Sequence, residues 1–100
     1  MFAAMPKPLA AGEIETALAA LPGWAYVDGT LRKTFLFGSF REAVSFIVRL
    51  AFSAEALNHH PELRNVYSRV EVALSTHDAD DQVTARDTEL AAEIEALSWV

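Results

Sequence analysis

The chain of 100 residues is 52% hydrophobic and 22% charged, with four Gly and four Pro. This composition excludes a disordered tail, a collagen-like repeat and a multidomain enzyme, and it predicts a single domain over residues 1–100 with residues 1–8 flexible. Fourteen acidic and eight basic residues give a formal charge of −6 without a basic cluster, so we expect no direct nucleic-acid partner.

The absence of cysteine and the hydropathy of the sequence restrict its chemistry and its location. Without cysteine there is no disulfide, no thiolate nucleophile and no Cys-ligated zinc site. No segment reaches the ~20 apolar residues that a membrane span needs, and the chain does not begin with an apolar run of signal-peptide length. We therefore expect a cytoplasmic protein without a membrane partner, whose reactive groups are His, carboxylates or hydroxyls.

The first third of the chain predicts a helix followed by a hairpin. Apolar residues recur at helical spacing over residues 13–21, and Pro22-Gly23 ends the pattern. Two strands follow, over residues 24–27 and 31–37, and Asp28-Gly29 between them favours a tight hairpin turn.

A long apolar helix is predicted from Phe40 to about Asn58. Ser39 and Glu42 have the spacing of a capping box, and Pro61 prevents the helix from continuing. We expect the helix to pack against more than one neighbour, because its apolar residues cover more than one face of the helix. The predicted stripe consists of Phe40, Ala43, Ile47, Leu50, Ala51 and Ala54, widened by Phe46 and Phe52.

The second half predicts two more strands and a terminal helix. Residues 69–76 alternate cleanly in polarity, and a shorter strand is predicted over residues 63–67. After an acidic loop over residues 78–83, Thr84 and Asp87 form a second capping-box pattern. The helix that follows carries Leu90, Ala91, Ile94 and Leu97 on its apolar side. The order α-β-β-α-β-β-α predicts an α+β two-layer sandwich with the helices on one face of the sheet.

Three histidines are the main candidates for chemistry. His59 and His60 end the second predicted helix, and His77 ends the strongest strand. Imidazole can give and take protons near neutral pH, which suits acid–base catalysis. Two alternatives stay open: the pair is also typical of a solvated helix end, and the three side chains could bind a metal ion. The acidic residues near such a metal site would be Asp78, Asp80 or Asp81.

Several further residues have structural explanations at this stage. Glu55 lies four residues before His59 and could support its ring or form a helical pair. Asp87 is explained by the capping box that it forms with Thr84. Tyr67 can be a core or interface aromatic, since a single aromatic residue does not identify a ligand.

A larger pattern of fixed spacings resembles a known family. Its members are Glu55, the run His59-His60-Pro61, Tyr67, His77 and Asp87. This pattern resembles the signature of the pterin-4a-carbinolamine dehydratases, the family that also contains the dimerisation cofactor of a homeodomain transcription factor. The similarity extends from about Leu9 to Leu97 and includes Gly23-Trp24 and the Phe35-x-Phe37 strand.

The resemblance implies a fold, an assembly and a reaction. The implied fold is a four-stranded antiparallel sheet with three helices packed on it, in subunits that form homodimers or homotetramers. The implied reaction removes water from a 4a-hydroxytetrahydropterin of the tetrahydrobiopterin type and gives the quinonoid dihydropterin, which recycles the cofactor of aromatic amino-acid hydroxylases. It needs no metal and no organic cofactor, because the pterin is the substrate.

The resemblance also implies roles by position. His59 and His77 would transfer protons, with the acid and base labels left open, and His60 would mainly hold the pterin. Residues that resemble the substrate-contacting segments of the family are Asn58, Ser75, Thr76 and Asp78. The remaining matched residues, Glu55, Pro61, Tyr67 and Asp87, would give structural support.

Two departures from the family pattern lie near the proposed site. Leu63 and Arg64 stand where the family often has an aromatic pair, and residues 78–82 form an acidic loop where the family usually has a glycine-rich one. The alternative function is therefore a non-catalytic module on the same fold that binds a pterin or a protein, linked to molybdopterin metabolism or to transcriptional regulation.

Overall fold

The structure is a computed structural model that describes residues 6–99. Its elements are α1 (Ala11–Ala19), β1 (Ala25–Val27), β2 (Thr30–Leu36), α2 (Phe40–Ala56), β3 (Glu62–Val66), β4 (Arg69–Leu74), the short 3-10 helix η1 (His77–Ala79) and α3 (Ala85–Leu97). The predicted order α-β-β-α-β-β-α is confirmed. The flexibility expected at the start of the chain falls partly on residues 1–5, which lie outside the described residues, whereas residues 6–8 belong to no helix or strand.

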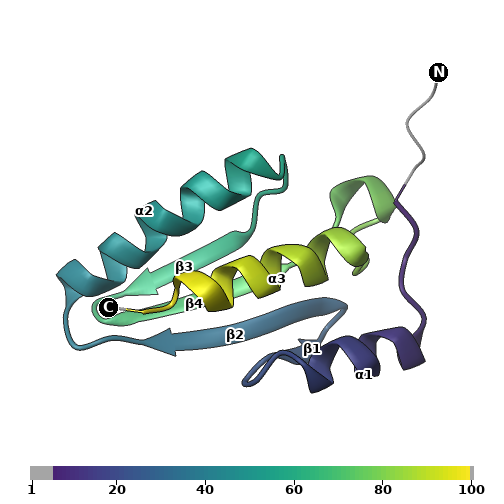
Figure 1. The fold of residues 1–100 in the computed structure, drawn as a ribbon, viewed down its shortest axis with the longest axis horizontal. Helices are drawn as coiled ribbons and strands as arrows, with labels where there is room; N and C mark the ends of the chain where they lie inside the picture. The colour runs from purple at the N-terminus through teal and green to yellow at the C-terminus, as the bar shows by residue number, and fades with distance from the viewer. Residues whose placement is uncertain (1–5, 100) are drawn as a thin grey trace.

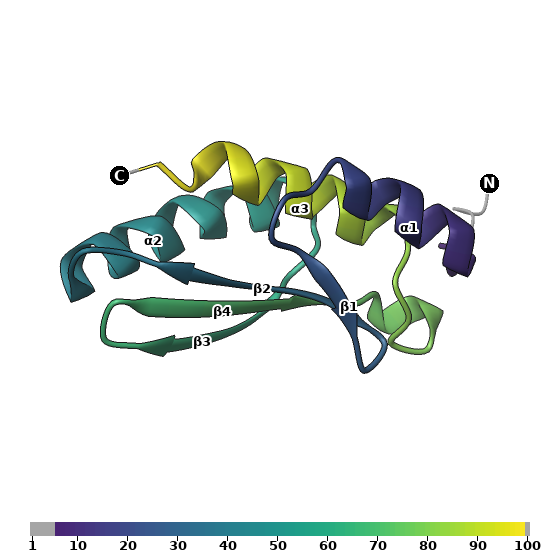
Figure 2. The same cartoon turned by 90° about the horizontal axis from the view of Figure 1, so that it is seen from below.

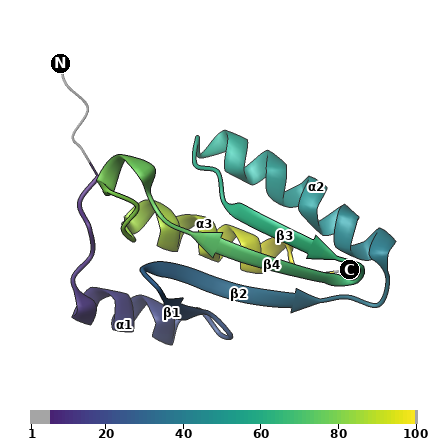
Figure 3. The ribbon, with the colours of Figure 1, turned by 180° about the vertical axis from the view of Figure 1, so that it is seen from behind.

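The four strands form one antiparallel sheet in the order β1-β2-β4-β3. The helices α1, α2 and α3 all lie on the same side of this sheet, as Figures 1 and 2 show. The opposite side, which faces the viewer in Figure 3, is covered by none of these helices. The predicted two-layer α+β sandwich is therefore confirmed. None of the helices within residues 6–99 is both long and apolar enough to cross a membrane.

The first hairpin turns as its sequence predicts. Asp28 and Gly29 have φ values of 50° and 78°, and Val27 pairs with Thr30 across them. Positive φ at both central residues is typical of a type I′ turn, which matches the twist of the two strands that it joins.

The core lies between the sheet and the helices. The largest fully buried apolar side chains are Phe46 and Leu50 from α2, Leu31 from β2, Leu74, Val70 and Val72 from β4, Val83, and Leu90 and Ile94 from α3. In β4 the buried residues are every second one, as the alternating sequence predicts. The core therefore fixes which side of the sheet faces the helices.

The predicted apolar stripe of α2 is partly wrong. Phe46 is fully buried, whereas Phe40 is about half exposed (52%) and Ala51 is exposed. At 100° per residue, the buried positions Ala43, Phe46, Leu50 and Ala54 share one narrow face, and Phe40 and Ala51 lie on its flank. The capping box at the start of α2 is also incomplete: Ser39 accepts a hydrogen bond from the Glu42 backbone N–H, but the Glu42 carboxylate accepts from Gly38.

The segment after β4 is more ordered than the predicted acidic loop. Strand β4 ends at Leu74, and Thr76 forms an isolated bridge with Gln82. Between them lies η1, followed by Asp80 and Asp81 in the left-handed region, with φ values of 55° and 58°. The loop is thereby folded back beside the end of β4.

Candidate functional site

Three chain segments meet at one end of the sheet: the end of α2, the segment after β4 and the start of α3 (Figure 1). They enclose a cleft of about 240 Å³. Its lining residues are Asn58, His59, His60, Ser75, Thr76, His77, Asp78 and Arg86. The structure thus brings together all three histidines and all four other residues that the sequence suggested for substrate contact.

The end of α2 turns His59 toward the interior. Asn58 adopts the left-handed conformation, with φ of 49°, just after the last helical turn. The backbone N–H of His59 donates to Ala54 O at 3.0 Å, and that of Asn58 donates to Glu55 O at 3.1 Å. These two bonds make a Schellman motif, which satisfies the last carbonyls of the helix and fixes the direction of the following residue.

A buried network holds the ring of His59. His59 is 7% exposed, and its Nε2 lies 2.5 Å from Oδ1 of Asp87, which is completely buried. The other carboxylate oxygen, Asp87 Oδ2, accepts a hydrogen bond from the Thr84 backbone N–H at 2.8 Å and one from Thr76 Oγ1 at 2.8 Å. The predicted capping box of α3 is confirmed, and its acid also holds a histidine 28 residues earlier in the chain.

The neighbouring His60 points out of the protein. Its Nε2 lies 2.7 Å from Oε1 of Glu55, and both side chains are largely exposed. The sequence suggested Glu55 as a support for His59. The structure differs, because the left-handed Asn58 directs His59 inward and leaves the adjacent ring beside the exposed carboxylate.

His77 is the most exposed of the three rings. Its side chain is 92% exposed, and its Nδ1 lies 3.3 Å from Oδ1 of Asp81 in the acidic segment. Asp78, on the same short helix, lines the cleft directly. The cleft therefore combines one buried, firmly held imidazole with two that are open to solvent.

None of the four predicted support residues lines the cleft: Glu55 and Asp87 bond to its histidines from outside, whereas Pro61 and Tyr67 lie elsewhere. Tyr67 has a positive φ of 53° in the turn between β3 and β4, at the other end of these strands, and is 69% exposed. Pro61 lines an adjacent hollow of about 270 Å³ that shares His60, Ser75 and His77 with the cleft. Tyr67 therefore lies at the end of the sheet away from the cleft.

Sequence reasoning missed Arg86. This residue lies in the first turn of α3, lines the cleft, and places Nη1 3.9 Å from Oδ2 of Asp78. The sequence offered one signal for Arg86, namely its position between the two capping-box residues Thr84 and Asp87. A residue at this position must lie near the hydrogen bonds that the capping box forms.

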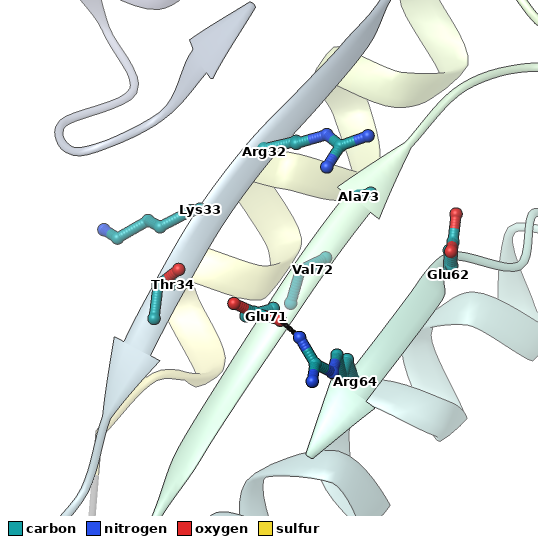
Figure 4. Close-up of a pocket in the computed structure, with 8 residues that line it drawn as sticks. All are labelled: Arg32, Lys33, Thr34, Glu62, Arg64, Glu71, Val72 and Ala73. Carbon is teal, nitrogen blue, oxygen red and sulfur yellow. Dashed lines mark hydrogen bonds and ion pairs between the residues drawn. The ribbon is translucent and has the colours of Figure 1, made fainter. Parts of the chain in front are cut away.

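A third hollow lies on the open face of the sheet (Figure 4). It measures about 310 Å³ and is lined by side chains of both charges, including Arg32, Glu62 and the ion pair of Arg64 with Glu71 at 3.5 Å. It contains no histidine, whereas all three histidines line the cleft described above. Within residues 6–99, no three His, Asp or Glu side chains come together in a way that could hold a metal ion.

Comparison with known proteins gives a consistent set of relatives. The model of the family "Pterin 4 alpha carbinolamine dehydratase" matches residues 7–97. A protein of Opitutus terrae named "Putative pterin-4-alpha-carbinolamine dehydratase" is 58% identical over 96 residues, which cover 96% of this chain and 99% of that protein. A protein of Rhodopseudomonas palustris with the same name is 47% identical, over 94% of each chain.

Two solved structures share the fold. A crystal structure from Brucella melitensis, described as a transcriptional coactivator/pterin dehydratase, aligns with a TM-score of 0.87 and 38% identity over 92% of this chain and 99% of that one. A pterin dehydratase-like protein identified as a RuBisCO assembly factor in the alpha-carboxysome aligns with a TM-score of 0.62 and 24% identity, over 75% of this chain and 86% of that one. The second similarity shows the fold alone.

Proposed function

The chain belongs to the pterin 4 alpha carbinolamine dehydratase family, and we propose that it removes water from a 4a-hydroxytetrahydropterin of the tetrahydrobiopterin type by histidine acid–base catalysis. The observation that carries this proposal is the presence of His59, His60 and His77 in one cleft of about 240 Å³. The proposal keeps the expectations drawn from the sequence: a cytoplasmic reaction in pterin recycling, without a metal or an organic cofactor.

The chemistry needs one proton donor and one proton acceptor. The C4a–O bond breaks with its electron pair on oxygen, and a proton from the acid converts the leaving hydroxide into water. A ring N–H gives its proton to the base, and its electron pair forms the new C=N double bond of the quinonoid dihydropterin. Hydroxide is a poor leaving group, so both transfers lower the barrier.

The proposed roles follow the different surroundings of the rings. His59 and His77 transfer the protons, and His60 holds the pterin with its neighbours. Asn58, Ser75, Thr76 and Asp78 are the proposed contacts for the polar edge of the pterin. Support for these roles comes from the shared cleft, in which every one of these residues is a lining residue.

The proposal is tested by stopped-flow absorbance of quinonoid dihydropterin formation from freshly generated 4a-hydroxytetrahydropterin. We expect the wild-type protein to accelerate the reaction over buffer, and His77→Ala to remove most of the acceleration, because a positioned acid contributes roughly 10²–10⁴-fold. Thr16→Ala, an exposed change on α1, serves as the control and should react like wild type. A wild-type rate equal to the buffer rate would refute the dehydratase function.

The second candidate is a module that binds a pterin or a protein partner without turnover. It is favoured by the acidic segment Asp78–Asp81 beside the cleft and by the description of the Brucella melitensis protein as both coactivator and dehydratase. Tight binding of molybdopterin, or of a partner protein, that survives His59→Gln and His77→Ala, together with no turnover of the carbinolamine, would support this candidate.

We also propose that the chain forms a homodimer or homotetramer through α2. Its outer face carries four large apolar side chains spaced four residues apart: Phe40, Val44, Val48 and Phe52. Phe52 is 75% exposed, and no charged residue belongs to this i, i+4 series. A helix stripe of this kind is self-complementary when two copies pack antiparallel, which favours a second copy of this chain as the occupant.

Introducing a charge into the stripe tests this assembly. Val48→Glu is expected to convert the oligomer into a monomer in sedimentation velocity experiments, because a second copy would bury the new carboxylate unpaired. Thr16→Glu places the same charge on the exposed side of α1 and should leave the sedimentation coefficient unchanged. A wild-type protein that sediments as a monomer at high concentration would contradict the proposal.

A further inference from the structure

We propose that Asp87 is a positioning residue that keeps the proton of the neutral His59 ring on Nε2, so that Nδ1 is the proton acceptor at the cleft. This inference rests on the proposed function, and it assigns the base that the sequence left open. His59 then takes the proton of the pterin ring N–H, and His77 is left as the donor to the departing oxygen.

The directions of the hydrogen bonds around Asp87 carry the argument. Thr84 Oγ1 accepts from the Arg86 backbone N–H at 3.2 Å and lies 2.7 Å from Thr76 Oγ1. Each hydroxyl has one hydrogen to donate. Because Thr76 donates to Asp87 Oδ2, the hydroxyl of Thr84 must donate to Thr76. The chain of donors therefore runs from Arg86 through both threonines and ends on the carboxylate.

Asp87 can only accept in this network. Its Oδ2 already receives the Thr76 hydroxyl and the Thr84 backbone N–H, and an ionised carboxylate has no proton to return. The atom 2.5 Å from Oδ1 is His59 Nε2, so this nitrogen must carry a hydrogen. In a neutral imidazole the other nitrogen, Nδ1, then has the free electron pair.

The second nitrogen of His59 is free to meet a ligand. Within residues 6–99, no side chain or backbone group forms a hydrogen bond with His59 Nδ1. His59 as a residue is 7% exposed, and it lines the cleft. When Nδ1 accepts a proton, the buried carboxylate stabilises the imidazolium that forms, as the aspartate of a catalytic triad does. Asp87 would act through His59 without touching the pterin.

The substitution Asp87→Asn tests this with little change in shape. The Thr84 backbone N–H and the Thr76 hydroxyl both donate at the Oδ2 position, so the oxygen of the new amide must occupy it. The NH₂ group of the amide then faces His59 Nε2 and donates to it. Nε2 becomes an acceptor, and the proton of the neutral ring moves to Nδ1.

The tautomer can be measured directly by two-bond ¹⁵N–¹H correlation NMR on the labelled full chain. We expect the neutral His59 ring of the wild type to carry its proton on Nε2, and that of Asp87→Asn to carry it on Nδ1. Glu93→Gln makes the same acid-to-amide change at an exposed site of α3 and should leave the His59 signals unchanged. A wild-type ring with its proton on Nδ1, or an Asp87→Asn ring that keeps it on Nε2, would overturn the inference.

Stopped-flow kinetics of the same variants separates positioning from folding. With the tautomer reversed, kcat should fall roughly 10²-fold while KM changes little, because the pterin contacts are retained. An unchanged kcat in Asp87→Asn would overturn the role of Nδ1 as the acceptor. If the wild type does not catalyse dehydration, the proposed function fails, and the NMR result still decides whether Asp87 sets the tautomer.

Discussion

Replacing His59 by Gln is expected to lower kcat for dehydration by about 10²–10⁴-fold, whereas His60→Gln is expected mainly to raise KM. The two residues are adjacent in the chain, but only His59 is buried and bonded to a buried carboxylate. Gln at position 59 can still donate an amide hydrogen to Asp87, so the variant keeps the buried acceptor satisfied while losing a group that takes up a proton.

The pair of variants is informative because the chemical change is the same in both. His60 is exposed and lies beside the exposed Glu55, so its loss removes a contact that ground state and transition state share, which raises KM. Single-turnover and steady-state rates should be measured for both proteins after circular dichroism has shown native folding. Equal losses of kcat in the two variants would show that the buried and the exposed ring do not have separate roles.

The fold could be predicted because its elements have strong local signals. Asp28-Gly29 gives positive φ at both turn positions, and Val70, Val72 and Leu74 alternate with polar residues along β4. The capping box formed by Thr84 and Asp87 marks the start of α3. Each of these features depends on residues within a few positions of one another, where sequence spacing and spatial proximity coincide.

Apart from Arg86, the residues that line the candidate site were predicted, but the contacts among them and with Asp87 were not. Family resemblance, rather than spacing, indicated which residues gather around His59, and the fold alone pairs it with Asp87. A helical i, i+4 relation suggested Glu55 for His59, but the left-handed Asn58 ends the helical geometry before this relation can form. Contacts across 28 residues depend on how α2 and α3 pack together, which local patterns do not contain.

The buried face of α2 shows the same limit. Phe40, Phe46 and Phe52 are equally apolar in the sequence, yet only Phe46 is in the core. Its ring centroid lies 4.8 Å from that of Phe35, which is in β2, and 5.0 Å from that of Phe37, which directly follows this strand. Which of several apolar residues is buried depends on the crossing of the helix over the sheet, so a wide apolar surface leaves the choice open.

Asp87→Ala is expected to lower the free energy of unfolding by about 3–5 kcal/mol, a large part of the 5–15 kcal/mol typical of a small domain. The carboxylate is completely buried and is the shared acceptor for the backbone of Thr84, the hydroxyl of Thr76 and the ring of His59. Alanine leaves these polar groups without their partner and removes one half of the capping box of α3.

Urea unfolding of Asp87→Ala, Asp87→Asn and a control variant separates the contribution of the hydrogen bonds of Asp87 from that of its charge. Glu93→Ala, exposed on the same helix, should change the free energy of unfolding by no more than about 0.5 kcal/mol. Asp87→Asn should lie between this control and Asp87→Ala, because the amide oxygen still accepts from Thr84 and Thr76. A loss below about 1 kcal/mol in Asp87→Ala would mean that water replaces the carboxylate, since an unsatisfied buried group costs about 1–3 kcal/mol. If instead the Asn and Ala variants are equally destabilised, the charge of the carboxylate beside His59, rather than the cap, dominates the stability of this end of the sheet.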